Sequence, residues 1–284
     1  MRVLDLFSGI GGFSLGLERA GMETVAFCEI EPYCQKVLRK HWPDVPIYED
    51  VRDVSKDRLE SDGITGIDVI TGGFPCQDIS VAGAQAGIEG ERSGLWGELC
   101  RVIGDIRPRF AIVENVTALI SGDSGKWFGR VLGDLAEIGY DCEWHCIPAS
   151  ELGAHHHRDR VWVIAYPNGL GGRELFSKKR QTIRKQLIGN GEDGRAWVIS
   201  DTMYKRLQGR EKQGSLKESR ERCNQFSPGQ ICGFGALKSV EPSVRGGFNG
   251  LPRRVDRLKG LGNAVVPQIP ELIGRAIMET YENP

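Results

Sequence analysis

The feature that most constrains this chain is a regular alternation, over residues 1–165, between short apolar runs and amphipathic segments. Segments between the runs repeat apolar residues at helical spacing, as Phe128, Val131 and Leu135 do. Strand–helix–strand alternation is typical of a mostly parallel sheet covered on both faces, so the sequence predicts an α/β fold. The expected strands are Val3–Phe7, Thr24–Cys28, Val69–Thr71, Phe110–Val113 and Arg160–Ala165.

The amino-acid composition changes after Pro167. Residues 167–250 are rich in Gly, Arg, Lys and Gln and contain few long apolar runs, which leaves a loop-rich small domain and a partly disordered segment as alternatives. Scattered apolar residues such as Trp197 and Phe226 favour the small domain. From Asn263 a helical pattern returns. We therefore expect a large domain over 1–165, a second domain over 166–260, and a C-terminal helix within 261–284 that docks back on the first.

Charge separates these parts more sharply than the net value of −1 indicates. Residues 1–165 carry 16 Lys and Arg against 26 Asp and Glu, whereas residues 166–260 carry 20 against 9. A basic module on an acidic body predicts a polyanionic partner contacted by one part of the protein. The alternative, basic loops that only maintain solubility, stays open on charge alone.

The overall composition is that of an ordinary soluble globular protein, with 40% hydrophobic and 26% charged residues. The first residues break into glycines after one short apolar run, so we expect no signal peptide, and no apolar stretch approaches the roughly 18 residues that a membrane span requires. Eight cysteines without a small-scaffold pattern favour a reduced, cytoplasmic setting over a disulfide framework.

A glycine-rich stretch, Asp5–Gly12, follows the first expected strand and precedes a helical pattern at Phe13–Ala20. Glycines let the backbone turn tightly and approach a ligand, while the helix start offers free amide hydrogens. The spacing is not that of a dinucleotide-binding loop, and a turn made for packing alone remains the alternative. Glu29 follows the expected strand Thr24–Cys28, and Asp50 follows a short third segment, Pro46–Tyr48, so their order after the glycine loop indicates an adenosine-containing ligand.

A second set of polar residues follows the later strands. Cys76 comes directly after Pro75 at the end of one strand, and Glu114 ends the next. Arg158 and Arg160 begin a further strand. Because the carboxyl ends of parallel strands meet at one edge, we expect a thiol nucleophile, a carboxylate and a cationic clamp to share a site there.

Two other clusters resemble metal ligands without the geometry for it. The three consecutive histidines at 155–157 would point to opposite faces of an extended segment, so we predict no metal site there. Tyr140, Cys142, Trp144 and Cys146 alternate as one face of a strand, which favours core packing over ligation.

The motifs taken in order resemble those of DNA cytosine C5-methyltransferases. Any one motif has low specificity, whereas the whole ordered series has high specificity; only the basic insert is unmatched. His156 stands where the family often has Gln. The matching segments are Asp5–Gly12, Glu29, Asp50, Gly73–Gln77, Arg92–Trp96, Glu114–Val116, Arg158–Arg160 and Gly262–Val265.

The resemblance implies a Rossmann-like S-adenosylmethionine-dependent methyltransferase fold, with residues 166–260 as a target-recognition domain. The implied reaction transfers a methyl group to carbon 5 of a cytosine flipped out of duplex DNA, through a covalent adduct of Cys76. Glu114 would hold ring nitrogen 3 and the exocyclic amine, and Arg160 the ring carbonyl oxygen. Arg158 would support the DNA backbone or the loop.

The resemblance also implies a cofactor pocket. Glu29 would bind the ribose hydroxyls and Asp50 the adenine amine. The methionine part would lie on the glycine loop, through Phe7, Gly9, Gly11 and Gly12, and the pocket would be completed by Pro75, Leu95, Asn263 and Val265.

The implied enzyme acts on duplex DNA as a monomer, in the cytoplasm and without a membrane. Two other functions stay in view. An RNA (tRNA) cytosine C5-methyltransferase would use the same catalytic parts, and the basic insert suits either polyanion. The intact Cys76, Glu114 and Arg160 argue against a non-catalytic relative. The recognition sequence, and membership of a restriction-modification system with a partner endonuclease, are not encoded in a readable pattern.

Overall fold

A computed structural model of the chain describes residues 1–75, 94–152, 158–168 and 262–282. All of these belong to one of the two units into which the chain divides, residues 1–180 with 252–284. The predicted basic domain at 166–260 lies outside the described residues except for its first three positions, and so do Cys76 and the histidines at 155–157.

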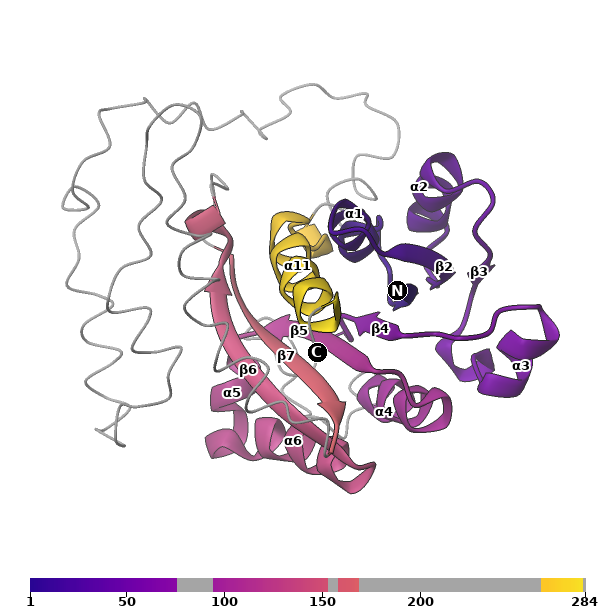
Figure 1. The fold of residues 1–284 in the computed structure, drawn as a ribbon. Coiled ribbons are helices and arrows are strands. Elements are labelled where there is room, and N and C mark those ends of the chain that lie inside the picture. The colour runs from indigo at the N-terminus through magenta and orange to yellow at the C-terminus, as the bar shows by residue number, and fades with distance from the viewer. Residues whose placement is uncertain (76–93, 153–157, 169–261, 283–284) are drawn as a thin grey trace, which may run out of the picture. The chain divides into compact units, whose positions relative to one another are not determined.

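The described part is built on a seven-stranded sheet in the order β3-β2-β1-β4-β5-β7-β6 (Figure 1). The first five strands in this order run parallel, and β7 lies antiparallel between β5 and β6. The predicted mostly parallel α/β sheet is therefore confirmed. The strands are β1 (Arg2–Leu6), β2 (Glu23–Cys28), β3 (Ile47–Tyr48), β4 (Val69–Gly72), β5 (Phe110–Val116), β6 (Tyr140–Pro148) and β7 (Asp159–Pro167).

Helices cover both faces of this sheet. One apolar cluster joins the sheet to α4 and α6, and a second joins it to α1 and α11, which lie side by side in Figure 1. The α-helices are α1 (Gly12–Arg19), α2 (Pro32–His41), α3 (Lys56–Ser61), α4 (Leu95–Ile106), α5 (Ala118–Ser121), α6 (Lys126–Glu137) and α11 (Gln268–Glu282). The described residues also form three short 3-10 turns, η1 (Val51–Asp53), η2 (Gly122–Gly125) and η3 (Ala149–Leu152).

The strands alternate between the two clusters residue by residue. Val3 and Val69 enter the cluster of α1 and α11, while Leu4 and Ile70 enter that of α4 and α6. Because both faces of the central strands are buried, their sequences are apolar almost without interruption. The C-terminal helix α11 packs on α1.

The outer strand β6 departs from expectation. The strand itself is confirmed, and Tyr140 is buried, but Trp144 is 47% exposed and Cys146 is also exposed, so core packing of the whole face was wrong. Helix α6 directly precedes this strand, and its first turns reach Trp144 through Phe128, at 5.5 Å between ring centroids.

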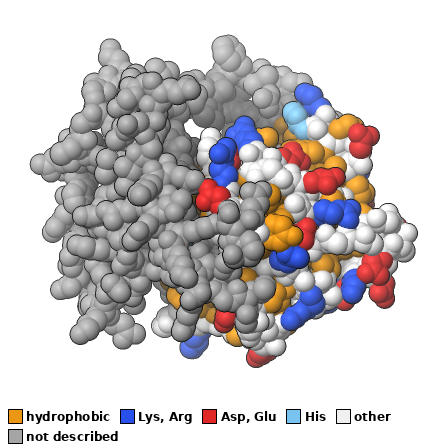
Figure 2. Space-filling view, in the orientation of Figure 1, with side chains coloured by type: hydrophobic (Ala, Val, Ile, Leu, Met, Phe, Trp, Pro, Cys, Tyr) orange, Lys and Arg blue, Asp and Glu red, His pale blue; other side chains and the backbone are white. Residues whose placement is uncertain are grey.

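The described surface carries mixed charge. In Figure 2 the Lys and Arg side chains are interspersed with Asp and Glu over the described face in view. Within the described ranges, no helix has the length and apolarity needed to cross a membrane.

Candidate active site at the carboxyl edge of the sheet

The predicted site residues gather where the parallel strands end. The glycine loop follows β1, Glu29 follows β2 and Asp50 follows β3. The peptide Gly73–Pro75 follows β4, and Glu114 lies near the end of β5. Ligands of open α/β sheets bind at this edge, so the topology brings two sets of motifs into one neighbourhood.

The glycine loop is a tight turn from β1 into α1. Gly9 and Gly11 have positive φ values of 55° and 85°, and Phe7 also lies in the left-handed region at 53°. The expected strand thus ends one residue early, before Phe7. A left-handed residue with a side chain costs about 1–2 kcal/mol. Ser8 stabilises the turn, because its hydroxyl donates to the Asp5 carbonyl at 2.6 Å and its amide to the Cys28 carbonyl at 3.1 Å.

The loop glycines have different reasons to be glycine. A Cβ on Gly12 would lie 2.4 Å from the carbonyl oxygen of Val265, and one on Gly11 would lie 2.6 Å from the Trp42 ring. A Cβ on Gly9 would have no neighbour within 4 Å among the protein atoms. Close packing therefore accounts for Gly11 and Gly12, whereas Gly9 faces open space that a ligand can enter.

Glu29 is a buried carboxylate held by main-chain donors. Its Oε2 accepts from the Gly9 amide at 2.6 Å, and its Oε1 from the Glu31 amide at 2.7 Å. Burial raises the pKa of Glu29, against the lowering effect of these hydrogen bonds. The next residue, Ile30, is 65% exposed. This apolar surface was not predicted, although an isoleucine directly after the acidic residue is visible in the sequence.

Asp50 differs from Glu29 in having a cationic partner. Its carboxylate accepts from the Arg52 amide at 2.9 Å and from the Arg52 guanidinium at 2.6 Å. These hydrogen bonds lower the pKa of Asp50. The same side chain caps the short turn η1. A ligand amine would therefore share this carboxylate with Arg52.

The remaining predicted pocket residues surround the loop from both faces of the sheet. Phe7 and Leu95 are partly buried and pack against the cluster of α4 and α6. Val265 packs against the cluster of α1 and α11. Pro75 is partly buried, and Asn263 is exposed.

Glu114 and Arg160 form an ion pair at the end of β5. Arg160 Nε lies 2.9 Å from Glu114 Oε1, and the two side chains are only 21% and 10% exposed. In the antiparallel register Glu114 pairs with Trp162, which places it on the same face as Arg160 two residues earlier. Burial raises the pKa of the Glu114 carboxyl, although Arg160 and Arg158 oppose the shift.

The peptide that leads to Cys76 lies against this pair. A Cβ on Gly73 would lie 3.0 Å from Glu114 Oε2. The buried Asn115 donates from Nδ2 to the Phe74 carbonyl at 3.1 Å, and Phe74 packs on Trp96 at 5.3 Å between ring centroids. Cys76 itself lies outside the described residues, and the chain is described up to Pro75. Asn115 was predicted only as part of a motif, and its hydrogen bond was not predicted.

The two arginines of the Arg158–Arg160 motif have different partners. Arg160 pairs with Glu114, whereas Arg158 Nη1 donates to the carbonyl oxygen of Gly262. Arg158 is partly buried, and burial lowers the pKa of its guanidinium. The structure therefore brings one arginine to the carboxylate and the other to the C-terminal segment.

A third buried carboxyl, Asp5, joins the two halves of the edge. It accepts hydrogen bonds from Ser14 of α1 and Thr71 of β4, both at 2.8 Å. Complete burial raises its pKa to about 7. Asp5 therefore connects the glycine loop and α1 to the strand that leads to Cys76.

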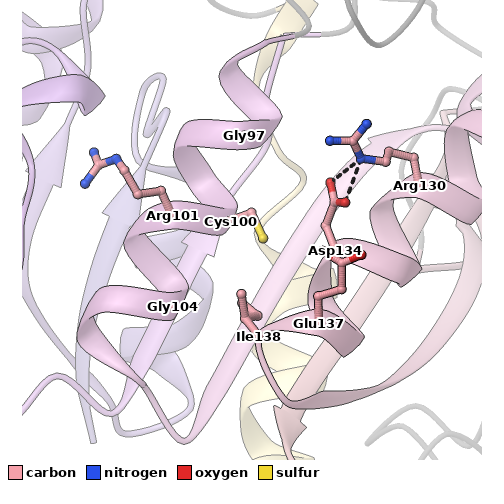
Figure 3. A pocket seen from close by; sticks show the side chains of 8 residues that line it. All are labelled: Gly97, Cys100, Arg101, Gly104, Arg130, Asp134, Glu137 and Ile138. Carbon is pink, nitrogen blue, oxygen red and sulfur yellow. Dashed lines mark hydrogen bonds and ion pairs between the residues drawn. The ribbon is translucent and has the colours of Figure 1, made fainter.

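A pocket lies elsewhere, between α4 and α6 (Figure 3). It contains none of the predicted site residues. Asp134 in its wall accepts from Arg130 at 2.6 Å and from Trp96 at 2.8 Å, so these charged groups are already paired. Its lining residues are Gly97, Cys100, Arg101, Gly104, Arg130, Asp134, Glu137 and Ile138.

Known proteins resemble this chain over most of its length. The family model of C-5 cytosine-specific DNA methylases matches residues 1–232. The type II methyltransferase M2.BsuMI of Bacillus subtilis is 33% identical over 209 residues, 72% of this chain and 50% of that protein. M.CviJI, from a Paramecium bursaria Chlorella virus, is 38% identical over 165 residues, 58% of this chain and 42% of that protein. The chain thus spans about half the length of the curated relatives it matches.

Among solved structures, an E. coli prophage chain, provisionally assigned as a DNA modification methyltransferase, is similar over 100% of both chains. Its TM-score is 0.63 at 19% sequence identity, so the likeness supports the fold alone. The family match covers the glycine loop, Glu29, Asp50, Glu114 and both arginines. This chain belongs to the C-5 cytosine-specific DNA methylase family.

Proposed function

We propose that the protein is a DNA cytosine C5-methyltransferase that transfers the methyl group of S-adenosylmethionine to carbon 5 of a flipped-out cytosine in duplex DNA. The observation that carries the proposal is the buried Glu114–Arg160 pair beside the peptide that leads into Cys76. The names of the relatives, type II methyltransferases, support the same reaction class.

The chemistry requires a nucleophile because carbon 5 of cytosine is too unreactive to take a methyl group directly. The Cys76 thiolate forms a bond to carbon 6, which makes carbon 5 behave as an enamine carbon. Carbon 5 would then take the methyl group as the bond between that group and the donor's sulfonium sulfur breaks, which leaves a neutral thioether. Loss of the carbon-5 proton to solvent restores the ring and breaks the carbon–sulfur bond, so that Cys76 is released.

Glu114 and Arg160 suit the ring that this reaction activates. A carboxyl whose pKa is raised by burial holds its proton more readily, and it can donate that proton to ring nitrogen 3 as the adduct forms. Arg160, 2.9 Å from this carboxyl, would bind the ring carbonyl oxygen. Because their mutual contact is between side chains, each can rotate toward an entering base.

The residues present fit S-adenosylmethionine, which supplies a sulfonium methyl group when bound. Gly9 borders open space, and each Glu29 oxygen, with one backbone donor, retains lone-pair capacity for a ribose hydroxyl. Ile30 offers an exposed apolar surface to a base, and Asp50 an acceptor to its amine. Phe7, Pro75, Leu95, Asn263 and Val265 would complete the pocket, with Gly11 and Gly12 allowing the loop to pack.

The remaining part of the proposal concerns the target. Residues 166–260, with 20 Lys and Arg against 9 Asp and Glu, would form the target-recognition domain and contact duplex DNA. The protein would act as a monomer in the cytoplasm. An RNA substrate is the competing outcome of the test below.

The test is transfer of labelled methyl groups from S-adenosylmethionine to duplex DNA. We expect transfer by the natural protein and none by Cys76→Ala, while Cys146→Ala, a change at an exposed cysteine, serves as the matched control and retains activity. Equal transfer by Cys76→Ala would refute the covalent mechanism. Preference for tRNA over duplex DNA would replace the DNA substrate by the RNA alternative.

A further inference from the structure

We infer that Arg158 is a positioning residue for the cofactor pocket, which acts by fixing the C-terminal segment Gly262–Val265 against the glycine loop. This differs from a direct contact with DNA or with the target base. The identity of the cofactor rests on the function proposed above, whereas the contacts that carry the inference do not.

The first contact is the hydrogen bond from Arg158 to Gly262, which distinguishes Arg158 from Arg160. Arg158 and Arg160 lie two residues apart at the start of β7, on one face of the sheet. The Arg160 guanidinium contacts Glu114, while Arg158 Nη1 donates to the carbonyl oxygen of Gly262, 104 residues along the chain. A hydrogen bond from a guanidinium is stronger than one between neutral groups, so it restrains a segment that has no strand or long helix of its own.

The second contact joins the same segment to the cofactor loop. The Val265 carbonyl oxygen lies so close to Gly12 that a Cβ there would stand 2.4 Å from it. One turn further, a Cβ on Gly16 would stand 2.3 Å from the carbonyl oxygen of Pro267. The backbone from Val265 to Pro267 is thus seated directly on the first turns of α1.

The third link lies within the loop. Helix α1 begins at Gly12, three residues after Gly9, whose amide donates to the Glu29 carboxylate at 2.6 Å. A continuous set of contacts therefore runs from Arg158 through Gly262–Val265 and Gly12 to Gly9 and Glu29. Loosening of the segment at Gly262 removes one restraint on the wall of the pocket that contains Asn263 and Val265.

The decisive measurement is S-adenosylmethionine binding by the full chain without any nucleic acid, for example by calorimetry. We expect Arg158→Gln to weaken binding about tenfold, the change that follows loss of one hydrogen bond to a charged group. Arg158→Lys retains a cation that can donate to the Gly262 carbonyl, so it should recover part of the affinity. Arg130→Gln, at an ion-paired arginine of α6 outside the site, is the matched control and should bind the cofactor within about twofold of the natural protein.

A second readout is independent of the cofactor. Amide hydrogen exchange over residues 262–267 should become faster in Arg158→Gln and stay unchanged in Arg130→Gln. Unchanged exchange and unchanged cofactor affinity in Arg158→Gln, with weaker DNA binding, would overturn the inference in favour of a DNA contact. Failure of the natural protein to bind S-adenosylmethionine would count against the proposed function, and the exchange experiment would then decide the inference alone.

Discussion

Two buried carboxylates at the same edge of the sheet are held in different ways. Glu29, after β2, accepts from the main-chain amides of Gly9 and Glu31. Glu114, near the end of β5, contacts the guanidinium of Arg160. Burial raises the pKa of both groups. Burial therefore disfavours the charged form of both carboxylates. The two differ in the donors that offset this effect, which are backbone amides for Glu29 and a guanidinium for Glu114.

The difference in donors suits two kinds of task. A backbone amide moves only if its loop is rebuilt, so the Glu29 region is organised before any ligand arrives. An ion pair between two side chains can exchange partners by rotation, at little cost to the backbone. The β2 edge thus suits a ligand that binds in one fixed pose, and the β5–β7 edge suits groups that change partners during a reaction.

The largest expected effect separates the regions by activity. Glu114→Gln should lower methyl transfer about 100-fold or more, the usual contribution of a positioned general acid. The reason is that the glutamine amide has no acidic proton to transfer to ring nitrogen 3. Binding of S-adenosylmethionine without DNA should stay unchanged. The measurements are single-turnover transfer and calorimetric binding.

The matched control is Glu29→Gln, which should show the opposite pattern. Its amide would place an N–H against the backbone N–H of Gly9 or Glu31, so cofactor affinity should fall. Transfer at saturating cofactor should recover most of its rate. If both variants lost affinity and rate to the same extent, the proposed division of labour would be wrong.

Much of the fold was predictable because its main signal is local. Apolar periodicity identified the strands now seen as β1, β2, β4, β5 and β7, and the order of motifs along the chain put their polar residues at one edge. The outer strand β6 was also predictable, but not the exposure of Trp144. That exposure depends on which neighbouring elements pack against the strand, and no periodicity within β6 encodes this.

Pairing between distant residues was not predictable in the same way. A glycine can indicate that another segment approaches closely, but it does not indicate which segment. The contact of Gly12 with Val265 is therefore seen only in the structure. The same holds for Arg158 and Gly262, since a carbonyl acceptor has no sequence signature. Asp50 was predicted to bind a ligand amine, and only the structure shows its pairing with Arg52.

A smaller effect tests whether burial sets the pKa of the buried carboxyls Asp5, Glu29 and Glu114. Asp5 joins the two regions through Ser14 and Thr71, and its pKa is raised from 3.8 to about 7. The folded state therefore binds an extra proton between about pH 4 and pH 7. The stability from this group is complete below about pH 4 and is lost as pH rises to about 7, a loss on the order of a few kcal/mol.

The variant Asp5→Asn removes this titration, and the hydroxyls of Ser14 and Thr71 can still bond to the amide. Urea unfolding from pH 5 to pH 8 should show the natural protein losing stability relative to the variant up to about pH 7 and no further. Glu114 titrates in both proteins, so its effect cancels in the difference, whereas Glu29 interacts electrostatically with Asp5 and contributes a smaller residual. Parallel stability curves would show that the Asp5 carboxyl is not kept neutral by burial.

The smallest effect concerns the packing of the cofactor loop. Gly12→Ala should destabilise the fold by about 1–3 kcal/mol, because its methyl group would meet the rigid backbone of Val265 at 2.4 Å. Gly97→Ala, in α4, is the matched control: a methyl there has no neighbour within 4 Å, so better helix propensity should stabilise by up to about 1 kcal/mol. Thermal unfolding measures both changes. A gain in stability from Gly12→Ala would mean that α1 and Val265 do not pack closely, and the glycine loop would then have to be explained by ligand binding at Gly12 as well as at Gly9.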